Sequence, residues 1–251
     1  MTTTDTTIAR SQVYAFFGNL FHWPDEESFD QLCRSLDEEL PAAFDALGLP
    51  GAREILEASH STSYEEYRDD YQATFGHTIQ SPCPPYEAEY GSQVLDFRQC
   101  IELGDIAGFF RAFGLKISGE FHDRPDHIVP ELEFMALVTF KEAFALENGH
   151  PDEHAEACRE AQQRFLDEHL AQWVPAFAVR LETATPSSLL QAAASMLREF
   201  INQECEQLDV PLGDEELSLR VFPFDADDDF TECSDPNKAF VPVGAVTKGS
   251  D

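Results

Sequence analysis

Hydrophobic residues recur along most of this chain with the period of an α-helix. In the first such stretch the apolar side chains fall three and four residues apart, and the stretch ends near Pro24. This spacing buries one face of a helix, whereas a strand would need strict alternation, and we find neither a convincing strand nor an internal repeat. The sequence therefore predicts an all-α fold. The apolar face of the first helix consists of Val13, Tyr14, Phe16, Phe17, Leu20 and Phe21.

Capping and turn residues mark where the predicted helices begin and end. Asp25 to Glu27 suit the first turn of a second helix, and Pro41 and Gly48 bracket a short third one. Thr62 or Ser63 opens another helix, because each is followed three residues later by a glutamate, as in a capping box. The later helices are expected at about 94–113, 126–146, 151–172 and 187–208.

Length and composition favour one domain. The chain has 251 residues, of which 43% are hydrophobic and 21 are phenylalanine, enough for one sizeable core. We predict a flexible N-terminus at residues 1–7, a helical domain at 8–215, and an acidic tail at 216–251 that contains proline and glycine. The tail lacks helical periodicity, so disorder is its main interpretation. The alternative is that its apolar run, Ala239–Val246, folds back and occupies a groove of the domain.

The chain shows no signature of export or of covalent cross-linking. The N-terminal segment has no basic region followed by an apolar one, and no apolar run is long enough to cross a bilayer. We therefore expect a soluble, cytoplasmic protein. The 6 cysteines form no CxxC pair, which fits neither a disulfide scaffold nor a zinc ribbon, so we expect reduced and mostly buried thiols.

The chain is strongly acidic. Its 48 Asp and Glu against 16 Lys and Arg give a formal net charge of -32 at pH 7, and such a polyanion would repel the phosphates of nucleic acids. The acidic residues are spread along the whole chain, as in proteins of salt-loving organisms. At about 1 M salt the Debye length is only about 3 Å, so recognition of a partner must depend on short-range ion pairs and apolar contacts.

The stretch from Pro84 to Met135 begins with a rigid loop. The consecutive prolines 84 and 85 stiffen an extended segment and place Tyr86 where its ring could stack on an arginine or pack against an apolar side chain. Glu87 and Glu89 follow as candidate charge partners. The alternative interpretation is a plain tight loop between two helices.

A second candidate binding position lies at an expected helix start. Asp126 could cap the helix that begins near His127, and Pro125 would fix the direction in which the chain enters that helix. A carboxylate at a cap can still accept hydrogen bonds from an arginine. The alternative is that Asp126 is only an N-cap and His127 an ordinary first-turn residue.

An aromatic stripe precedes the rigid loop. Tyr67, Tyr71 and Phe75 recur at helical spacing, and Gly76 follows them. Core packing is the usual interpretation of such a stripe. The alternative is one wall of a peptide-binding groove, because the next loop leads directly to Tyr86.

Motifs typical of catalysis and cofactor binding are absent from the sequence. It contains no GxxxxGK[ST] phosphate loop, no GxSxG elbow, no GxGxxG after a strand and no HExxH. His150, His154 and Cys158 have the helical spacing of metal ligands, but Pro151 places His150 outside the helix. We therefore expect no enzymatic activity, no cofactor and no metal site.

Five segments distributed along the chain carry a family resemblance. They are YRDDYQATFGH from Tyr67, CPPYEAEYG from Cys83, DIAGFFRAFGL from Asp105, RPDHIVPELEFM from Arg124 and FLDEHLAQWVPAF from Phe165. In this order and spacing they resemble the TorD/DmsD/NarJ family of molybdoenzyme chaperones, over residues 10–208. The resemblance implies a single all-helical domain of the TorD type that acts in the cytoplasm. Such a protein binds the twin-arginine signal peptide of a molybdopterin oxidoreductase and holds back export until the cofactor is inserted.

The resemblance also implies a client class and a binding site. PPYEAEYG followed by DIAGFFRAFG is most similar to chaperones of the dimethyl sulfoxide or nitrate reductase type. One alternative is a structural delta-like subunit that remains in the mature complex. The other is a nucleotide-binding or hydrolytic enzyme, for which the sequence contains no motif. Either a monomer or a homodimer fits the resemblance. The implied signal-peptide site comprises Tyr67, Tyr71, Phe75, Gly76, Pro84, Pro85, Tyr86, Glu87, Pro125, Asp126 and His127.

Overall fold

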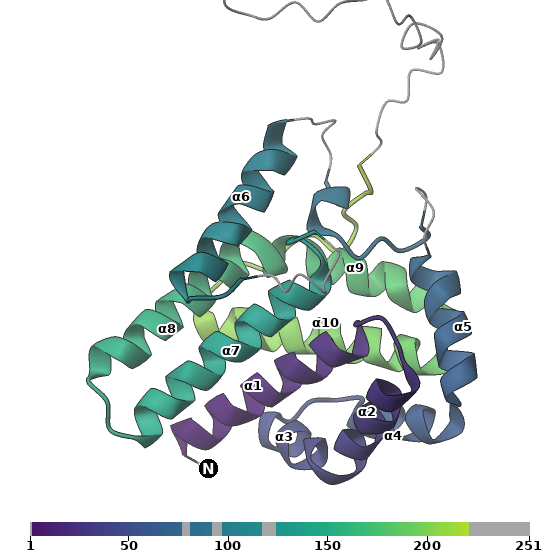
Figure 1. The fold of residues 1–251 in the computed structure, drawn as a ribbon, viewed down its shortest axis with the longest axis horizontal. Coiled ribbons are helices and arrows are strands. Elements are labelled where there is room, and N and C mark those ends of the chain that lie inside the picture. Colours follow the sequence, from purple (N-terminus) through teal and green to yellow (C-terminus); the bar gives the residue numbers. More distant parts are fainter. Residues whose placement is uncertain (1, 77–80, 92–96, 117–123, 221–251) are drawn as a thin grey trace, which may run out of the picture. The chain divides into compact units, whose positions relative to one another are not determined.

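The structure is a computed structural model that describes residues 2–76, 81–91, 97–116 and 124–220, with the backbone alone at 97–102. In this part of the chain the regular elements are helices, and the β pairs are isolated bridges. The chain up to Arg220 forms one compact unit (Figure 1). The predicted all-α fold is confirmed.

Short connections join most of the helices to one another. Their bounds are α1 Thr3–Leu20, α2 Glu26–Glu38, α3 Leu40–Leu47, α4 Ala52–Ser61, α5 Tyr64–Phe75, α6 Phe97–Ala112, α7 Ile128–Glu147, α8 Asp152–Phe165, α9 Ala171–Ala184 and α10 Ser188–Leu208. A 3₁₀ turn, η1, spans Glu87–Glu89, and a π turn, η2, spans Leu166–Leu170.

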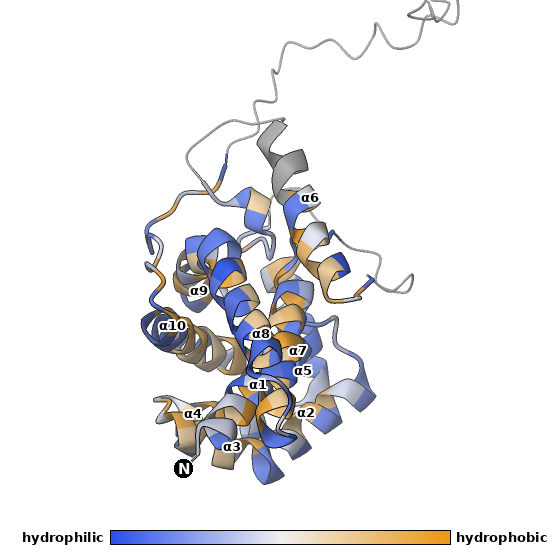
Figure 2. Cartoon of the chain, turned by 90° about the vertical axis from the view of Figure 1, so that its left-hand side faces the viewer, coloured by the Kyte–Doolittle hydropathy of each residue, from blue (hydrophilic) through white to orange (hydrophobic). Residues whose placement is uncertain are grey.

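Long helices packed side by side form the core. α1 lies along α7, α8 packs on α7, and α10 packs on α9 (Figure 1). In Figure 2 the hydrophobic side of α10 is turned toward the other helices and its hydrophilic side is turned outward. Aromatic rings connect these helices, since Phe17 of α1 stacks on Phe200 of α10 and the edge of Phe21 meets Phe177 of α9.

A buried ion pair crosses the centre of the helices. The Arg10 side chain is 1% exposed, and its Nε and Nη2 each lie 2.6 Å from the Glu204 carboxylate. Nη2 also donates to Gln162, Nη1 lies 3.8 Å from Glu142, and the Tyr14 hydroxyl donates to Glu204. Burial opposes a charge here, but Glu204 raises the pKa of Arg10 above its ordinary value. The sequence interpretation did not include this pair.

The ends of several helices follow the predicted signals. Ser63 and Glu66 form a capping box at the start of α5, and Gly48 adopts a positive φ after α3. The N-terminus differs from the prediction, because residues 3–7 belong to α1 instead of a flexible segment. Thr2 and Asp5 cap each other's backbone amides there and stabilise the first turn. The described cysteines are the free thiols Cys33, Cys83, Cys158 and Cys205.

The predicted helix at 151–172 differs most from the structure. It continues as α8, η2 and α9 through Pro175, a residue that normally ends a helix because it cannot donate to the carbonyl four residues back. That carbonyl, of Ala171, instead accepts from the Gly213 amide at 2.9 Å. Only glycine fits at 213, since a Cβ there would lie 2.4 Å from the same oxygen. The segment after α10 thus supplies the hydrogen bond that Pro175 cannot donate to the Ala171 carbonyl.

The buried ion pair generates a prediction about stability. Arg10→Met leaves the Glu204 carboxylate buried without its partner, so we expect the free energy of unfolding to fall by about 3–5 kcal/mol. The double variant Arg10→Met/Glu204→Met removes both charges and should recover much of this loss. Guanidinium chloride unfolding measures both values. A loss below about 1 kcal/mol for the single variant, within the range of an exposed pair, would contradict the assigned role.

Candidate functional site

Two segments that are distant in the sequence meet where α7 begins. They are the Pro-Pro loop at residues 84–90 and the segment 124–128, and together we call them the corner. Tyr86 and His127 face each other there in an isolated antiparallel bridge. Two backbone hydrogen bonds of 2.9 Å hold it, from the Ile128 amide to the Pro85 carbonyl and from the Glu87 amide to the Asp126 carbonyl.

Asp126 lies inside the corner and does not cap α7, which corrects one sequence interpretation. The N-cap is His127, whose Nδ1 accepts from the Val129 amide at 3.2 Å. Asp126 is fully buried, and its carboxylate accepts from the Ala88 amide at 3.1 Å. Because the cap is one residue later than predicted, the Asp126 side chain is left to bind a cation.

An arginine of the chain itself occupies the corner. The Arg124 guanidinium binds Asp126 through two atoms, with Nε 2.9 Å from Oδ1 and Nη2 2.5 Å from Oδ2. Its Nη1 lies 3.2 Å from the Glu89 carboxylate, and its Cζ lies 4.7 Å from the centre of the Tyr86 ring. We call Asp126, Glu89 and Tyr86 the guanidinium site. Burial opposes the charge of Arg124, but Asp126 and then Glu89 raise its pKa above the ordinary value.

The predicted residues of the corner differ in how far they reach the surface. Tyr86 and Pro125 are half-buried, and the edge of the Tyr86 ring meets His127 at a centroid distance of 5.1 Å. Pro84 and Pro85 are buried and act through their carbonyl oxygens, which accept from Tyr90 and Ile128. Pro84 and Pro85 therefore position the corner, whereas Tyr86 and Pro125 reach its surface.

The aromatic stripe belongs to the core. The hydroxyls of Tyr67 and Tyr71 donate to the carbonyl oxygens of Leu20 and Phe21 at the end of α1. The Phe75 ring stacks on Phe177 of α9 and is 5% exposed. Gly76 ends α5 with a φ of 43°. These residues therefore fit the core interpretation. Any effect that they have on peptide binding would come from how they position α5.

Glu87 points away from the corner into a buried polar cluster. Its carboxylate lies 3.1 Å from Nδ1 of His169, in the π turn η2. Burial opposes the charge of His169, but its bond to Glu87 raises the pKa of the imidazole. Glu131 belongs to the same buried cluster, and its Oε2 accepts from Nε1 of Trp173 at 3.2 Å. Burial first, and then the Glu87 carboxylate, raise the pKa of Glu131 well above its ordinary value.

The segment after α10 returns to the corner. The amide of Arg220 donates to the Glu89 carbonyl at 2.7 Å, and the amide of Gly91 donates to the Ser218 carbonyl at 2.9 Å. Gly91 has a φ of 138°, and a Cβ there would lie 2.6 Å from Nε of Arg220. Residues 218–220, which fall within the tail predicted to be disordered from residue 216 onward, are therefore attached to the loop that carries Glu89. The alternative docking segment, Ala239–Val246, lies outside the described residues.

Among the described residues, one group of possible metal ligands lies close together. Asp105, Glu168 and His169 place their ligand atoms within 4.8 Å of one another. Each already has an ionic partner, since His169 pairs with Glu87 and Asp105, and Arg164 binds Glu168. Internal ion pairs thus account for the group, and we assign no metal to it.

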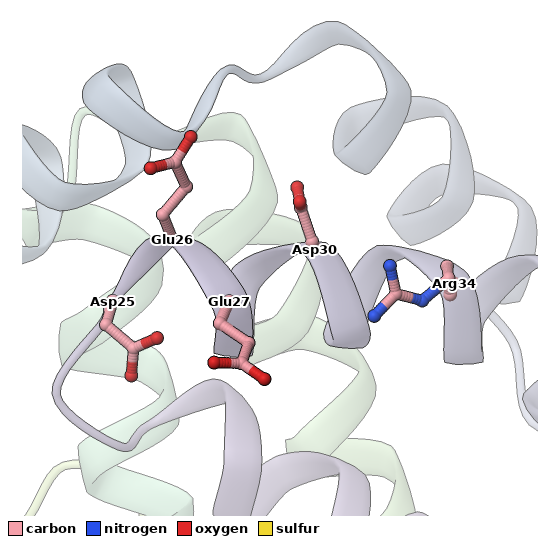
Figure 3. Close-up of a pocket in the computed structure, with 5 residues that line it drawn as sticks. All are labelled: Asp25, Glu26, Glu27, Asp30 and Arg34. Carbon is pink, nitrogen blue, oxygen red and sulfur yellow. The ribbon is translucent and has the colours of Figure 1, made fainter.

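An acidic depression lies on α2, apart from the corner residues. Figure 3 shows four carboxylates of its first turns, with Arg34 one turn further along. Asp25 has a structural role there, because its side chain accepts from the Ser28 amide and caps the helix. Glu26 and Glu27 lie in the first turn and suit the positive end of the helix dipole, so we assign the depression no binding role. Its lining consists of Asp25, Glu26, Glu27, Asp30 and Arg34.

A family model, the nitrate reductase delta subunit, matches residues 26–179. The perchlorate reductase assembly chaperone protein of Dechloromonas aromatica (strain RCB) is 26% identical over 211 residues, 81% of this chain and 92% of the relative. The selenate reductase assembly chaperone protein of Thauera selenatis is 40% identical over 89 residues, 36% of this chain and 44% of the relative. A solved redox enzyme maturation protein from Archaeoglobus fulgidus aligns with a TM-score of 0.45 at 21% identity, over 77% of this chain and 93% of that one.

Within the described ranges, no helix is both long and apolar enough to cross a bilayer.

The buried carboxylates generate a prediction about pH. Because burial, and after it the Glu87 and Asp126 carboxylates, raise the pKa of Glu131, its stabilising contribution is full below the unfolded value near 4.3 and is lost as pH rises toward the folded value. Glu131→Gln keeps the acceptor for Trp173 but does not titrate. The melting temperature of the variant should therefore exceed that of the wild type by a margin that widens from pH 5 to pH 8. We expect a few degrees, since about 1 kcal/mol shifts a chain of this size by about 2–4 °C.

The matched control for this measurement is Glu38→Gln, on the exposed side of α2. Its difference from the wild type should not widen in the same way. A Glu131→Gln margin that is constant or shrinks with rising pH would show that Glu131 is charged in the folded protein at low pH.

Proposed function

This chain belongs to the nitrate reductase delta subunit family, and we propose that it binds the twin-arginine signal peptide of a molybdopterin oxidoreductase while that enzyme is assembled. The protein is a maturation chaperone for a redox enzyme and not an enzyme itself. We propose that its client is of the dimethyl sulfoxide or nitrate reductase type, and that binding takes place in the cytoplasm, before export. The assembly chaperones of perchlorate and selenate reductase among its relatives support a client of this chemistry.

The guanidinium site of the corner is the observation that carries the proposal. Two carboxylates and an aromatic ring surround one arginine side chain there. A twin-arginine signal presents the same planar, bidentate group twice, so its chemistry matches the chemistry that the corner already holds. These contacts are short, and they stay effective at about 1 M salt, where long-range attraction is screened.

A second candidate function is that of an accessory subunit retained in the finished reductase. The description of the matching family as a subunit family favours it. The two functions differ in when the chain leaves its client. A chaperone is released once the client is complete, whereas a subunit stays bound.

Fractionation of cells that make the client distinguishes these functions. We expect the chain to be captured together with a precursor that still carries its signal peptide, and to be missing from the exported, cofactor-loaded reductase. A stoichiometric band of this chain in the purified mature complex would favour the accessory subunit.

Calorimetry tests the peptide site. At about 1 M salt, a peptide with the Arg-Arg pair should bind the wild type at least about tenfold more tightly than its Lys-Lys counterpart, because an ammonium cannot form the bidentate contacts. Asp126→Asn keeps the side-chain shape and an acceptor for the Ala88 amide, but it should reduce this preference several-fold. Asp30→Asn, in the acidic depression on α2, serves as the matched control and should leave the preference unchanged.

A photoreactive residue placed beside the arginine pair locates the contact directly. We expect cross-links to residues 84–90 or 124–128. Equal affinity for both peptides, or cross-links confined to the acidic depression, would contradict the proposed site.

A further inference from the structure

We infer that Arg124 is an internal competitor for the guanidinium site, and that an arginine of the client binds there by taking its place. This inference rests on the proposed function, because it concerns how the same site admits the signal peptide. It adds a residue, Arg124, to those that determine which peptides the chain accepts.

The site is fully used when Arg124 is in place. Both oxygens of Asp126 contact its guanidinium, and Oδ2 also accepts from the Ala88 amide. Nη1 donates to the Glu89 carboxylate, and the Tyr86 ring lies against the guanidinium group. Asp126 is 0% exposed, whereas the Arg124 side chain is 33% exposed. Among the described residues, Arg124 is therefore the group that a second guanidinium would have to displace to contact the Asp126 carboxylate.

The frame of the site includes hydrogen bonds that the Arg124 side chain does not supply. The Tyr86–His127 bridge, its flanking backbone hydrogen bonds and the Ala88 amide hold the two segments together through groups that Arg124 does not supply. Asp126 would keep this amide bond after Arg124 left. The site can thus exchange one occupant for another without losing its shape.

Replacement of one guanidinium group by another explains a preference for arginine. A buried carboxylate without a cation is costly, so the site is not left empty when Arg124 leaves. An incoming guanidinium restores both bidentate contacts and the stacking on Tyr86. An ammonium restores one contact point, and an apolar residue restores none. Arg124 therefore sets a threshold that a client arginine can meet and that lysine or an unrelated peptide cannot.

A competitor within the chain lowers the apparent affinity. The observed dissociation constant equals the intrinsic one divided by the fraction of molecules in which Arg124 is undocked. If that fraction is about a tenth, removal of the Arg124 charge should tighten binding about tenfold. In the opposite case, Arg124 is a structural residue that holds the corner together. Its removal then leaves peptide binding unchanged or weakens it.

Calorimetry with the Arg-Arg peptide separates these roles. Arg124→Gln should bind it about tenfold more tightly than the wild type, and its affinity for the Lys-Lys peptide should rise by a similar factor, because a competitor lowers both apparent affinities equally. Arg111→Gln, at an exposed position on α6, changes the net charge equally and should leave the affinity as it is. Equal or weaker binding by a folded Arg124→Gln variant would overturn the inference.

A second measurement needs no variant and covers the case in which Arg124→Gln does not fold. Phenylglyoxal modifies accessible arginines, and mass spectrometry quantifies the modification at each position. Addition of the Arg-Arg peptide to the wild type should increase modification of Arg124 several-fold, while Arg111 reacts as before. Modification of Arg124 that stays constant or decreases would show that it remains docked and would refute displacement.

The two proposals fail in distinguishable ways. If the wild type binds the Arg-Arg peptide but neither measurement shows displacement, the inference is wrong and the proposed function stands. If neither the wild type nor Arg124→Gln binds the peptide, both fail. Binding by Arg124→Gln alone supports both, with the internal competitor masking the site in the wild type.

Discussion

The buried pair of Arg10 and Glu204 constrains how the helices pack. It joins the first helix to the last, and through Gln162 and Glu142 it also involves α8 and α7. Because a buried charge tolerates little displacement from its partners, the four helices must keep a common register along their lengths. That register places the start of α7 against the Pro-Pro loop, so a charge pair in the centre helps to set the geometry at the surface.

Local signals in the sequence predicted those helices whose ends are determined locally. The capping box at Ser63 and the glycine at 48 act through their neighbours alone, and both have the predicted effect. The continuation of α9 through Pro175 could not be predicted in this way. It depends on the Gly213 amide, which lies far along the chain and becomes available only in the folded protein. The short helix α4 was missed because its start, at Gly51, carries no side-chain cap.

The corner shows the same division between local and long-range information. The sequence predicted Tyr86 and Asp126 as candidate binding residues, from a rigid loop and a helix start, but their contacts follow from the meeting of the two segments. Arg124 was overlooked although it lies two residues before Asp126 in a chain with 16 basic residues. Glu87, predicted as a charge partner at the surface, instead faces His169 inside the molecule. A pattern of residue types was enough to propose the region, whereas the direction of each side chain could be known only from the folded structure.

The return of the chain to the corner after α10 affects how shortened forms of this protein must be designed. The backbone at 218–220 acts as an additional edge for the loop that carries Glu89. A truncation at residue 216 would remove this edge along with the tail. A change in ligand binding could then not be assigned to the edge or to the tail. A stop codon after Arg220 keeps the edge intact. For the same reason, an affinity tag on the N-terminal side is the safer choice for binding measurements.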